Sequence, residues 1–437
     1  MNKQTLYTAD YVITQNANRD VIEQGGVLIE GSRIICVGHS DMMQVMYPEA
    51  ELVAMGKAAI MPGLINSHTH VSMSLLRGYS DDKKLMDWLT EDIFPIENKF
   101  NGDIIAMGAR FSFAEMIRSG TTAFYDMYML EDGIYKAADE MGLRGACGES
   151  MSRFYPSLCA PSMEALCDIL RERAEAWSGH PRLRHAILPH APYTSTPELL
   201  QTMHQLAIDT GSLFGMHLAE SESETQFCLE NYNKRPIPYC KDIGLLKEGN
   251  SFFHVIHAND EEIDMLAESG CIAVHNPVSN MKLASGCSPI SKMHAKGVKL
   301  ALGTDGPASN NAQNMQREMF VASLLHKFDE MDSTAAPAQR VLDMATLGGA
   351  QALCDPLIGC LEPGMRADFI ALDLTVPNMQ PVHNIVSNIV YASSGMENRL
   401  TVVDGKELYR DGKFLSCDYT GLCEEMDKLV QWVKSVK

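Results

Sequence analysis

The chain has 437 residues, of which 46% are apolar and 21% charged, and it contains no low-complexity tract. This length suffices for one large α/β barrel with a smaller satellite domain, and the composition excludes a largely disordered protein. The formal net charge is −20 at pH 7. Because an acidic surface repels phosphate backbones, nucleic acid is not an expected partner.

The sequence lacks the patterns that direct a protein to a membrane or out of the cell. The N-terminal region has no apolar core of a signal peptide, and no stretch approaches the roughly 18 apolar residues of a membrane span. The 12 cysteines are scattered without a C-x-x-C pair, which is typical of reduced thiols. We therefore expect a soluble, cytoplasmic protein in which histidines and carboxylates would bind any metal.

Residues 1–57 predict a small β layer. Three short strands are expected, and the turn at residues 30–32 joins the last two as a hairpin. Nothing in this region shows a helical period. The three strands cover residues 11–15, 26–30 and 33–37.

From residue 58 to residue 355, short apolar runs alternate with longer amphipathic stretches, which predicts repeated βα units around a parallel sheet. The eight expected strands are 59–65, 121–125, 143–147, 185–188, 213–217, 251–254, 271–275 and 299–302. The helices expected between and after them include 103–118, 197–210, 260–267, 314–326 and 335–353. Eight such units predict a TIM (β/α)8 barrel. A doubly wound open sheet is the alternative, but no G-x-G-x-x-G follows the first strand.

The strand pattern returns after residue 356. We expect strands at 368–372, 385–391, 400–403 and 406–410, followed by a terminal helix at 420–437. These strands are expected to pair with residues 1–57. The sequence therefore predicts one small β-sandwich domain formed from both chain ends, 1–57 and 356–437.

Histidines and acids follow the expected barrel strands at several places. The first strand leads to His68 and His70, the fifth ends at His217 with Glu220 close behind, and the eighth leads to Asp305. Three other expected barrel strands, the fourth, the sixth and the seventh, end at or near His190, His254 and His275. In a parallel barrel all strand ends of one polarity lie on one rim, where TIM-barrel chemistry takes place.

These residue types favour metal-assisted hydrolysis. In an extended H-x-H segment both imidazoles point to the same side, and with a third histidine and a carboxylate they form a credible Zn²⁺ site that keeps a position for water. Water bound in such sites has a pKa near 7. A neighbouring glutamate can move its proton to a leaving group. The sequence supplies His68, His70, His217 and Asp305 for the ion and Glu220 for the proton.

Each signal alone has a simpler interpretation. An isolated H-x-H is a weak metal motif, a single strand-end histidine is more often an ordinary hydrogen-bonded residue, and Asp305 in a G-T-D-G segment is typical of a turn. The coincidence across three expected strands favours the metal site.

Several segments resemble one protein family. The blocks at residues 61–70 and 302–306 look like the first-strand and eighth-strand signatures of amidohydrolase-superfamily deaminases. Other segments are more specific and resemble one branch of this superfamily, that of the 5-methylthioadenosine/S-adenosylhomocysteine deaminases and the related triazine chlorohydrolases. These segments are residues 74–78, 87–89, 95–97, 275–283 and 309–311. Residues 364–369 extend the resemblance to the C-terminal part.

The resemblance implies hydrolytic deamination of an adenine nucleoside to its inosine analogue and ammonia. The candidate substrates are 5-methylthioadenosine, adenosine, 5′-deoxyadenosine and S-adenosylhomocysteine. The family implies one zinc ion bound by His68, His70, His217 and Asp305, because the position of the bridging lysine of two-metal members is occupied by residues 188–190, Leu-Pro-His. Three histidines and an aspartate also suit Fe²⁺, Mn²⁺ or Ni²⁺.

The resemblance also implies the roles of the remaining residues. Glu220 shuttles the proton, Asp305 belongs to the catalytic group as well as to the ligands, and His254 polarises the attacking water, with His257 as the alternative. For the substrate, Glu97 and His190 hold the ribose hydroxyls, and Ser309 and Trp88 line the pocket. The structural alternatives are a first-turn helix acid at Glu97, a core residue at Trp88 and a turn residue at Ser309.

One departure concerns the substrate tail. Some relatives carry an arginine after the third strand that can bind the homocysteine carboxylate, and here this position aligns with Glu149. An acid there would repel the carboxylate, although Arg153 lies nearby in the sequence.

Two other functions stay open at this point. The same residues suit another heterocycle, such as guanine, an oxidised purine, a pterin or a triazine, and a barrel can also bind a ligand without catalysis. A small-molecule partner is expected in each case, and the sequence is compatible with a homo-oligomer.

Overall fold

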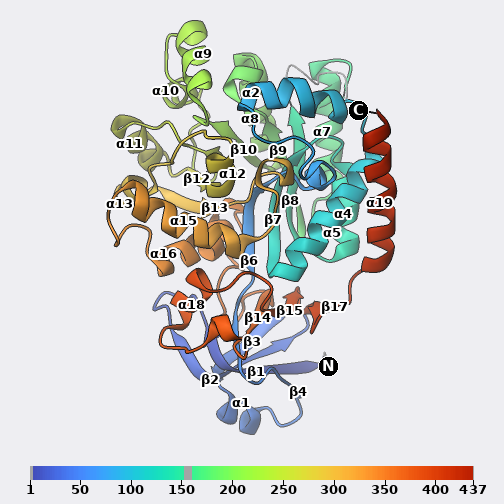
Figure 1. The fold of residues 1–437 in the computed structure, drawn as a ribbon, viewed down its shortest axis with the longest axis vertical. Helices are drawn as coiled ribbons and strands as arrows, with labels where there is room; N and C mark the ends of the chain where they lie inside the picture. The colour runs from blue at the N-terminus through green and yellow to red at the C-terminus, as the bar shows by residue number, and fades with distance from the viewer. Residues whose placement is uncertain (1–2, 152–159, 437) are drawn as a thin grey trace.

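The computed structural model describes residues 3–151 and 160–436. Two sheets organise this part of the chain, a parallel sheet of eight strands and a mixed sheet of nine. Figure 1 shows the parallel sheet surrounded by helices and the mixed sheet at the opposite end of the molecule, where the first and last parts of the chain meet.

The parallel sheet is the predicted TIM barrel. Its strands follow in chain order as β6 (Leu64–Thr69), β7 (Thr121–Tyr128), β8 (Arg144–Met151), β9 (Leu183–Pro189), β10 (Leu213–Leu218), β11 (Ser251–His254), β12 (Ile272–His275) and β13 (Lys299–Leu302). The two ends of the sheet meet where the Asp305 N–H donates to the carbonyl of His68 at 2.9 Å. Gly303 permits this approach, because an added Cβ would lie 2.7 Å from the His68 nitrogen.

Helices cover the barrel, and the five predicted helical segments are helical. The longer helices are α4 (Gly102–Ser119), α5 (Asp132–Met141), α7 (Met163–Ala176), α8 (Pro197–Thr210), α9 (Glu222–Tyr232), α10 (Pro236–Asp242), α11 (Asp260–Ser269) and α15 (Met315–Asp329). The shorter ones are η1 (Val71–Leu76), α2 (Leu85–Asp87), η2 (Trp88–Ile93), α3 (Phe94–Glu97), η3 (Pro192–Thr194), α12 (Pro277–Lys282), α13 (Ile290–Ala295), α14 (Pro307–Asn310), α16 (Ala338–Asp343), η4 (Met344–Gly348) and α17 (Gly349–Ala352). Within the described ranges, no helix combines the length and apolarity that crossing a bilayer requires.

The expected first barrel strand, 59–65, is divided between the two sheets. β5 (Ala58–Pro62) pairs with a C-terminal strand of the mixed sheet, and only β6 belongs to the barrel. Gly63 separates them, and any side chain there would collide with Thr122, whose Oγ1 lies 2.0 Å from the position of an added Cβ. The chain therefore passes from the mixed sheet to the barrel at Gly63.

The mixed sheet brings both chain ends together in the order β17-β16-β15-β14-β5-β1-β2-β3, and β4 pairs with β1. Its strands are β1 (Gln4–Ile13), β2 (Val21–Glu30), β3 (Arg33–His39), β4 (Glu51–Ala54), β14 (Phe369–Asp373), β15 (Asn398–Val403), β16 (Lys406–Arg410) and β17 (Lys413–Phe414), in addition to β5. This separate sheet fits the predicted small β-sandwich domain of the two chain ends.

Two local predictions in this domain are wrong. Residues 385–391, expected as a strand, form helix α18 (Ile385–Tyr391), because Asn384 caps its first turn and Ile385 and Ile389 bury one face a turn apart. Residues 1–57 also contain a helix, α1 (Ser40–Met46), where none was expected. Tertiary packing outweighed the β propensity of the Ile-Val-rich segment.

The terminal helix is confirmed as α19 (Tyr419–Val436). It lies along the outside of the barrel beside α4 (Figure 1). Trp432 contacts Phe100, and Tyr419 stacks near Phe111, with ring centroids 6.1 and 6.3 Å apart. The C-terminal segment is therefore part of the packed structure and not a free tail.

Candidate metal centre and active site

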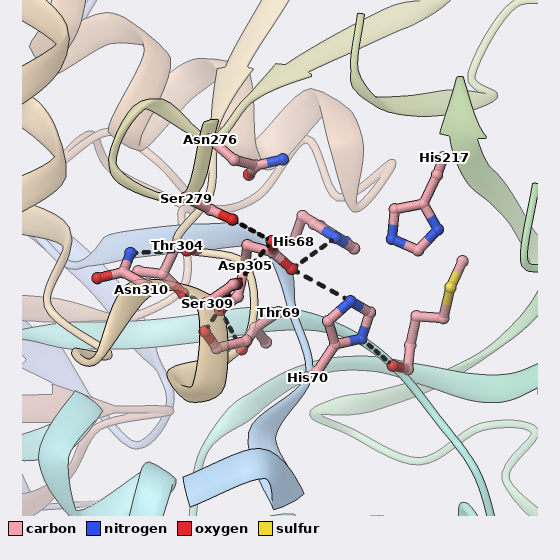
Figure 2. A network of polar contacts seen from close by, with 12 residues as sticks. His68, Thr69, His70, His217, Asn276, Ser279, Thr304, Asp305, Ser309 and Asn310 are labelled. Carbon is pink, nitrogen blue, oxygen red and sulfur yellow. Dashed lines mark hydrogen bonds and ion pairs between the residues drawn. The ribbon is translucent and has the colours of Figure 1, made fainter. Parts of the chain in front are cut away.

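Four of the predicted residues converge at the C-terminal end of the barrel strands, called the rim below. Nε2 of His70 lies 3.1 Å from Oδ1 of Asp305, and Nε2 of His68 lies 3.4 Å from the same oxygen. The ring of His217 has its centroid 4.9 Å from that of His68. Figure 2 shows the three imidazoles turned towards one space beside the Asp305 carboxylate.

The donor set fits a divalent cation. Nδ1 of His68 is buried without a hydrogen-bond partner among the described residues, and ligand atoms of His68, His70 and Asp305 lie within 4.8 Å of one another. Burial lowers the pKa of His68 to about 3 and holds that of His217 well below its usual value. Both rings are therefore neutral, which is the form that binds a metal.

The contacts of His70 show that the carboxylate attracts positive charge here. Burial alone would lower the pKa of His70, but its hydrogen bond and ion pair with Asp305 raise the pKa to about 9. A bound cation would take over this neutralisation. The rim is thus a place where a divalent metal fits both the geometry and the charge.

Neighbouring groups fix the orientation of these side chains. Nδ1 of His70 contacts the Met127 carbonyl, and Nδ1 of His217 donates to the His190 carbonyl at 2.8 Å. Such partners set the tautomer so that the other ring nitrogen is free for a metal. Sequence reasoning missed both contacts, because backbone carbonyls leave no signal in side-chain identity.

Asp305 is held by two hydroxyls. Its Oδ2 accepts from Ser279 at 2.5 Å and from Ser309 at 2.9 Å (Figure 2). Ser309 was predicted as a substrate residue, and it does line the cavity, but its hydroxyl is directed to the carboxylate. Ser279 was not predicted, although it belongs to the 275–283 block that carried the family resemblance.

Of the two alternative histidines, His254 faces the metal cluster. Its ring atoms lie within 4.8 Å of ligand atoms of His68 and His217, and its Nε2 is 3.9 Å from Oε1 of Glu220. Asn280 contacts the other ring nitrogen at 2.8 Å. His257 instead contacts the Ser285 carbonyl at 2.9 Å and does not contribute to the described cavity lining.

Glu220 is positioned by a second buried carboxylate. Glu224 accepts the backbone N–H groups of Ala219 and Glu220 at 3.0 and 2.9 Å. Burial raises the pKa of Glu220, and it raises that of Glu224 to about 8. These two hydrogen bonds hold the backbone just after β10 in place. They thereby fix the position from which the Glu220 side chain extends beside the cluster.

Some unusual backbone conformations lie at the same rim. Positive φ values occur at Ala219 (52°), His254 (73°), Val255 (43°) and Asp305 (62°). None is glycine, and such conformations cost free energy that the surrounding packing must compensate. Strain of this kind at several strand ends at once is typical of functional sites.

A cavity opens from the metal cluster. The predicted substrate residues Glu97, His190, Trp88 and Ser309 all line it, together with Glu220 and His254. The rest of the described lining is largely apolar: Met73, Leu85, Leu89, Phe94, Met127, Met129 and Leu283. Glu97 is buried and accepts a hydrogen bond from the Tyr128 hydroxyl at 2.5 Å.

Glu149 does not occupy the position that the sequence alignment suggested. It is buried on β8, where it accepts from the Leu130 N–H at 2.8 Å and pairs with Arg173 at 2.9 Å. Ser150, the next residue, lines the cavity instead. The expected repulsion between Glu149 and a substrate carboxylate is therefore not supported. Arg153 lies outside the described residues.

The comparisons with known proteins agree with the fold described above. Residues 59–408 match the model of the amidohydrolase family. This chain is an amidohydrolase. The match covers the whole barrel and the strands β5, β14 and β15 of the mixed sheet, and it agrees with the resemblance seen in the sequence.

Similar amidohydrolases are known as deaminases. The chain is 46% identical, over 98% of its length and 97% of the relative's, to a 5-methylthioadenosine/S-adenosylhomocysteine deaminase of Nitratidesulfovibrio vulgaris. It is 36% identical to a 5′-deoxyadenosine deaminase of Methanopyrus kandleri, with 95% and 96% of the two chains covered. A solved adenosine deaminase of Xanthomonas campestris with bound zinc has a TM-score of 0.95, 31% identity and 99% coverage of both chains.

Proposed function

We propose that this amidohydrolase replaces the 6-amino group of an adenine nucleoside by oxygen from water, which yields the inosine analogue and ammonia. The observation that carries the proposal is the arrangement of Glu220 and His254 at the edge of the three-histidine, one-aspartate cluster. The three relatives described above are named as deaminases of adenine nucleosides, and they support the reaction class.

The cluster suits one zinc ion held by His68, His70, His217 and Asp305, since three imidazole nitrogens and a carboxylate are common zinc ligands that leave a position open. When bound, the ion would lower the pKa of water so that hydroxide is available at neutral pH. Zinc in the Xanthomonas campestris structure supports this choice of metal. Metal analysis of purified protein decides between zinc and the other divalent ions.

Glu220 and His254 divide the proton chemistry. Burial raises the pKa of Glu220, so its carboxyl group can hold a proton and deliver it to the purine ring nitrogen next to the reacting carbon. The resulting carboxylate then takes the proton of the hydroxyl group that has been added to the reacting carbon and passes it to the amino group, which leaves as ammonia. His254, fixed by Asn280, would hold the attacking water in line with the ring.

The cavity lining suits a nucleoside better than a free base. Glu97 and His190 are proposed to bind the ribose hydroxyls, because a carboxylate can accept from two neighbouring hydroxyls in a geometrically selective way. Trp88 and the apolar residues around it are proposed to cover the ring and the 5′ substituent. Asp305 is kept in place by Ser279 and Ser309 while it acts as a ligand.

Glu220→Gln tests the proton role. The variant is expected to keep its metal but to lose turnover by about 10²–10⁴-fold, the usual contribution of general acid–base catalysis. Glu222→Gln, an exposed acid two residues away, is the matched control and should remain fully active. Normal turnover in Glu220→Gln would refute the assignment.

A substrate panel tests the substrate class. Adenosine, 5-methylthioadenosine, 5′-deoxyadenosine, S-adenosylhomocysteine and free adenine are compared by the loss of adenine absorbance and by ammonia release. We expect the nucleosides to react and adenine to react far more slowly. Equal rates for adenine and its nucleosides, or sole activity on guanine, a pterin or a triazine, contradict the nucleoside assignment.

A further inference from the structure

One buried glutamine connects the two ends of the barrel sheet next to the metal cluster. Gln313 lies in the segment between α14 and α15, and it is fully buried, with 0% of its surface exposed. It is not among the described residues that line the cavity, and it has no part in the proposed proton transfer. Its side chain nevertheless makes four hydrogen bonds. A buried amide with this many partners holds its surroundings in one arrangement.

The four partners of Gln313 come from both ends of the sheet. Its Oε1 accepts from Asn66 Nδ2 at 3.1 Å, from Thr69 Oγ1 at 2.8 Å and from Thr304 Oγ1 at 3.1 Å. Its Nε2 donates to the backbone carbonyl of Asp305 at 2.9 Å. Because a carbonyl can only accept, the atom that faces it is the amide nitrogen, and the orientation of the amide is unambiguous.

These contacts place Gln313 across the seam of the barrel, where β6 meets the segment that follows β13. Three of the four proposed ligands lie at this seam, since Thr69 stands between His68 and His70 in the chain and Asp305 is itself a ligand. Oδ1 of Asp305 lies 3.4 and 3.1 Å from Nε2 of the two histidines. The separation of these ligands therefore depends on how the seam is held.

The backbone of Asp305 needs such support. Its φ of 62° is costly for a residue other than glycine. Besides Gln313, the hydroxyls of Thr69 and Thr304 contact the same carbonyl, at 3.3 and 2.9 Å, and Figure 2 shows both threonines beside Asp305. The amide of Gln313 contacts all three of these residues at once.

Gln313 is itself attached to the helix layer outside the barrel. Its backbone N–H donates to Oε1 of Glu115 on α4 at 2.9 Å, and Glu115 forms an ion pair with Arg77. The amide therefore extends to the seam from a fixed point and does not simply follow the two strands that it connects.

We propose that Gln313 is a positioning residue for the metal centre. By holding Thr69 and the Asp305 carbonyl on one amide, it fixes the separation between the histidine ligands and the aspartate ligand. This role rests on the metal site of the proposed function, but it does not depend on the substrate. Gln313 itself contacts neither the ion nor the substrate in this proposal.

The chain offers a matched control three residues further on. Gln316 is also fully buried, with 0% of its surface exposed. Its Nε2 donates to the Ser119 carbonyl at 3.2 Å, and its Oε1 accepts from the Ser393 hydroxyl. Neither partner is a proposed ligand or a neighbour of one in the chain. Gln316→Met therefore removes a buried amide of the same kind without changing the seam.

Metal binding by the metal-free proteins tests the proposal. The unchanged protein, Gln313→Met and Gln316→Met are titrated with Co²⁺ in competition with a chelator. The visible spectrum of bound Co²⁺ is also recorded, because it depends on the number and arrangement of the ligands. We expect Gln313→Met to bind Co²⁺ about 10–100-fold more weakly, the usual effect of changing an outer partner of metal ligands, and with an altered spectrum. Gln316→Met should keep the affinity and the spectrum of the unchanged protein.

Thermal unfolding of the metal-free proteins shows whether the variants are folded. Equal weakening in both glutamine variants, or a folded Gln313→Met with the affinity and spectrum of the unchanged protein, overturns the positioning role. Deamination is measured separately. An unchanged protein that shows the expected Co²⁺ results but does not deaminate adenine nucleosides refutes the proposed reaction and supports the positioning role. An unchanged protein that binds no Co²⁺ overturns both.

Thr69→Val provides a second test, which applies even where Gln313→Met does not fold. The substitution removes one hydroxyl and keeps the shape of the side chain, so a smaller loss of Co²⁺ affinity is expected. In the double variant with Gln313→Met, the loss should be smaller than the product of the two single losses, because both changes remove the same contact. Unchanged affinity in Thr69→Val, or losses that simply multiply, overturns the proposal.

Discussion

Two buried carboxylates show how the rim differs from the rest of the barrel. Asp368, at the junction with the small β domain, accepts from Arg144 Nε at 2.5 Å and Nη2 at 3.1 Å, and Asp404 contacts the same guanidinium at 3.0 Å. Asp305 at the rim is surrounded by imidazoles and hydroxyls. At the junction the buried carboxylate is paired with an arginine, which is always charged, whereas at the rim its neighbours include imidazoles that can ligate a metal ion.

The difference explains why one site contributes to stability and the other to chemistry. A buried carboxylate with a bidentate arginine is satisfied in the folded chain itself. A buried carboxylate beside imidazoles, of which His68 and His217 are held neutral by burial, can bind a cation together with them.

Removal of the rim carboxylate should have the largest effect. Asp305→Asn is expected to lose the bound metal and to reduce deamination to background, since an amide cannot supply the negative charge that the site offers to a cation. Metal content by mass spectrometry and kcat are the measurements. An Asp305→Asn protein that keeps stoichiometric metal and full activity would remove the contrast between the two carboxylates.

Removal of the junction arginine should act on stability instead. Arg144→Met leaves Asp368 buried without its partner, which typically costs about 3–5 kcal/mol of unfolding free energy. Urea unfolding measures the loss, and the metal content of the folded variant should be unchanged. Arg399→Met is the control, because its pair with Asp411 is partly exposed and surface pairs contribute about 0–1 kcal/mol. Equal losses in both variants would contradict the prediction.

A smaller effect on activity is expected when Glu224, which accepts the backbone N–H of Glu220, is changed. In Glu224→Gln one carboxylate oxygen becomes an amide donor that faces the N–H groups of Ala219 and Glu220. Loss of such outer contacts lowers activity about 10–100-fold in metal sites. We expect kcat to fall with unchanged metal content and little change in KM. A rise in KM alone would assign Glu224 to substrate binding.

The smallest predicted effect is a pH dependence of stability. Burial raises the pKa of Glu318 to about 8, and its partners are the amides of Asn310 and Val278, at 2.6 and 3.3 Å. The folded state therefore holds this proton more tightly than the unfolded state, so stability falls as the pH rises from about 4.5 to 8. Arg317 opposes this rise in pKa and Asp305 adds to it.

Glu318→Gln should remove part of this loss of stability. The melting temperatures of the variant and the unchanged protein are compared at pH 5.5 and 8.5 with the metal content held constant. We expect the difference between the two pH values to be smaller in the variant. An identical pH dependence would mean that Glu318 is already ionised in the folded state.

The convergence of His68, His70, His217 and Asp305 at the rim was predictable, because each lies in or just after a barrel strand of recognisable pattern. The partners that orient them were not, since the carbonyls of Met127 and His190 are contributed by whatever residue happens to occupy the position. The Ile-Val-rich residues 385–391 were assigned to a strand because their propensity is local, whereas their helical form depends on the Asn384 cap and on packing.

Periodicity and residue type can be seen in the linear order of the residues, and they were enough to predict a barrel with three histidines and one aspartate at its rim. The direction of individual side chains was not predictable in this way. His254 and not His257 faces the cluster, and Glu149 pairs with Arg173 and does not line the cavity. Side-chain direction depends on contacts between segments far apart in the chain, and no local pattern encodes those contacts.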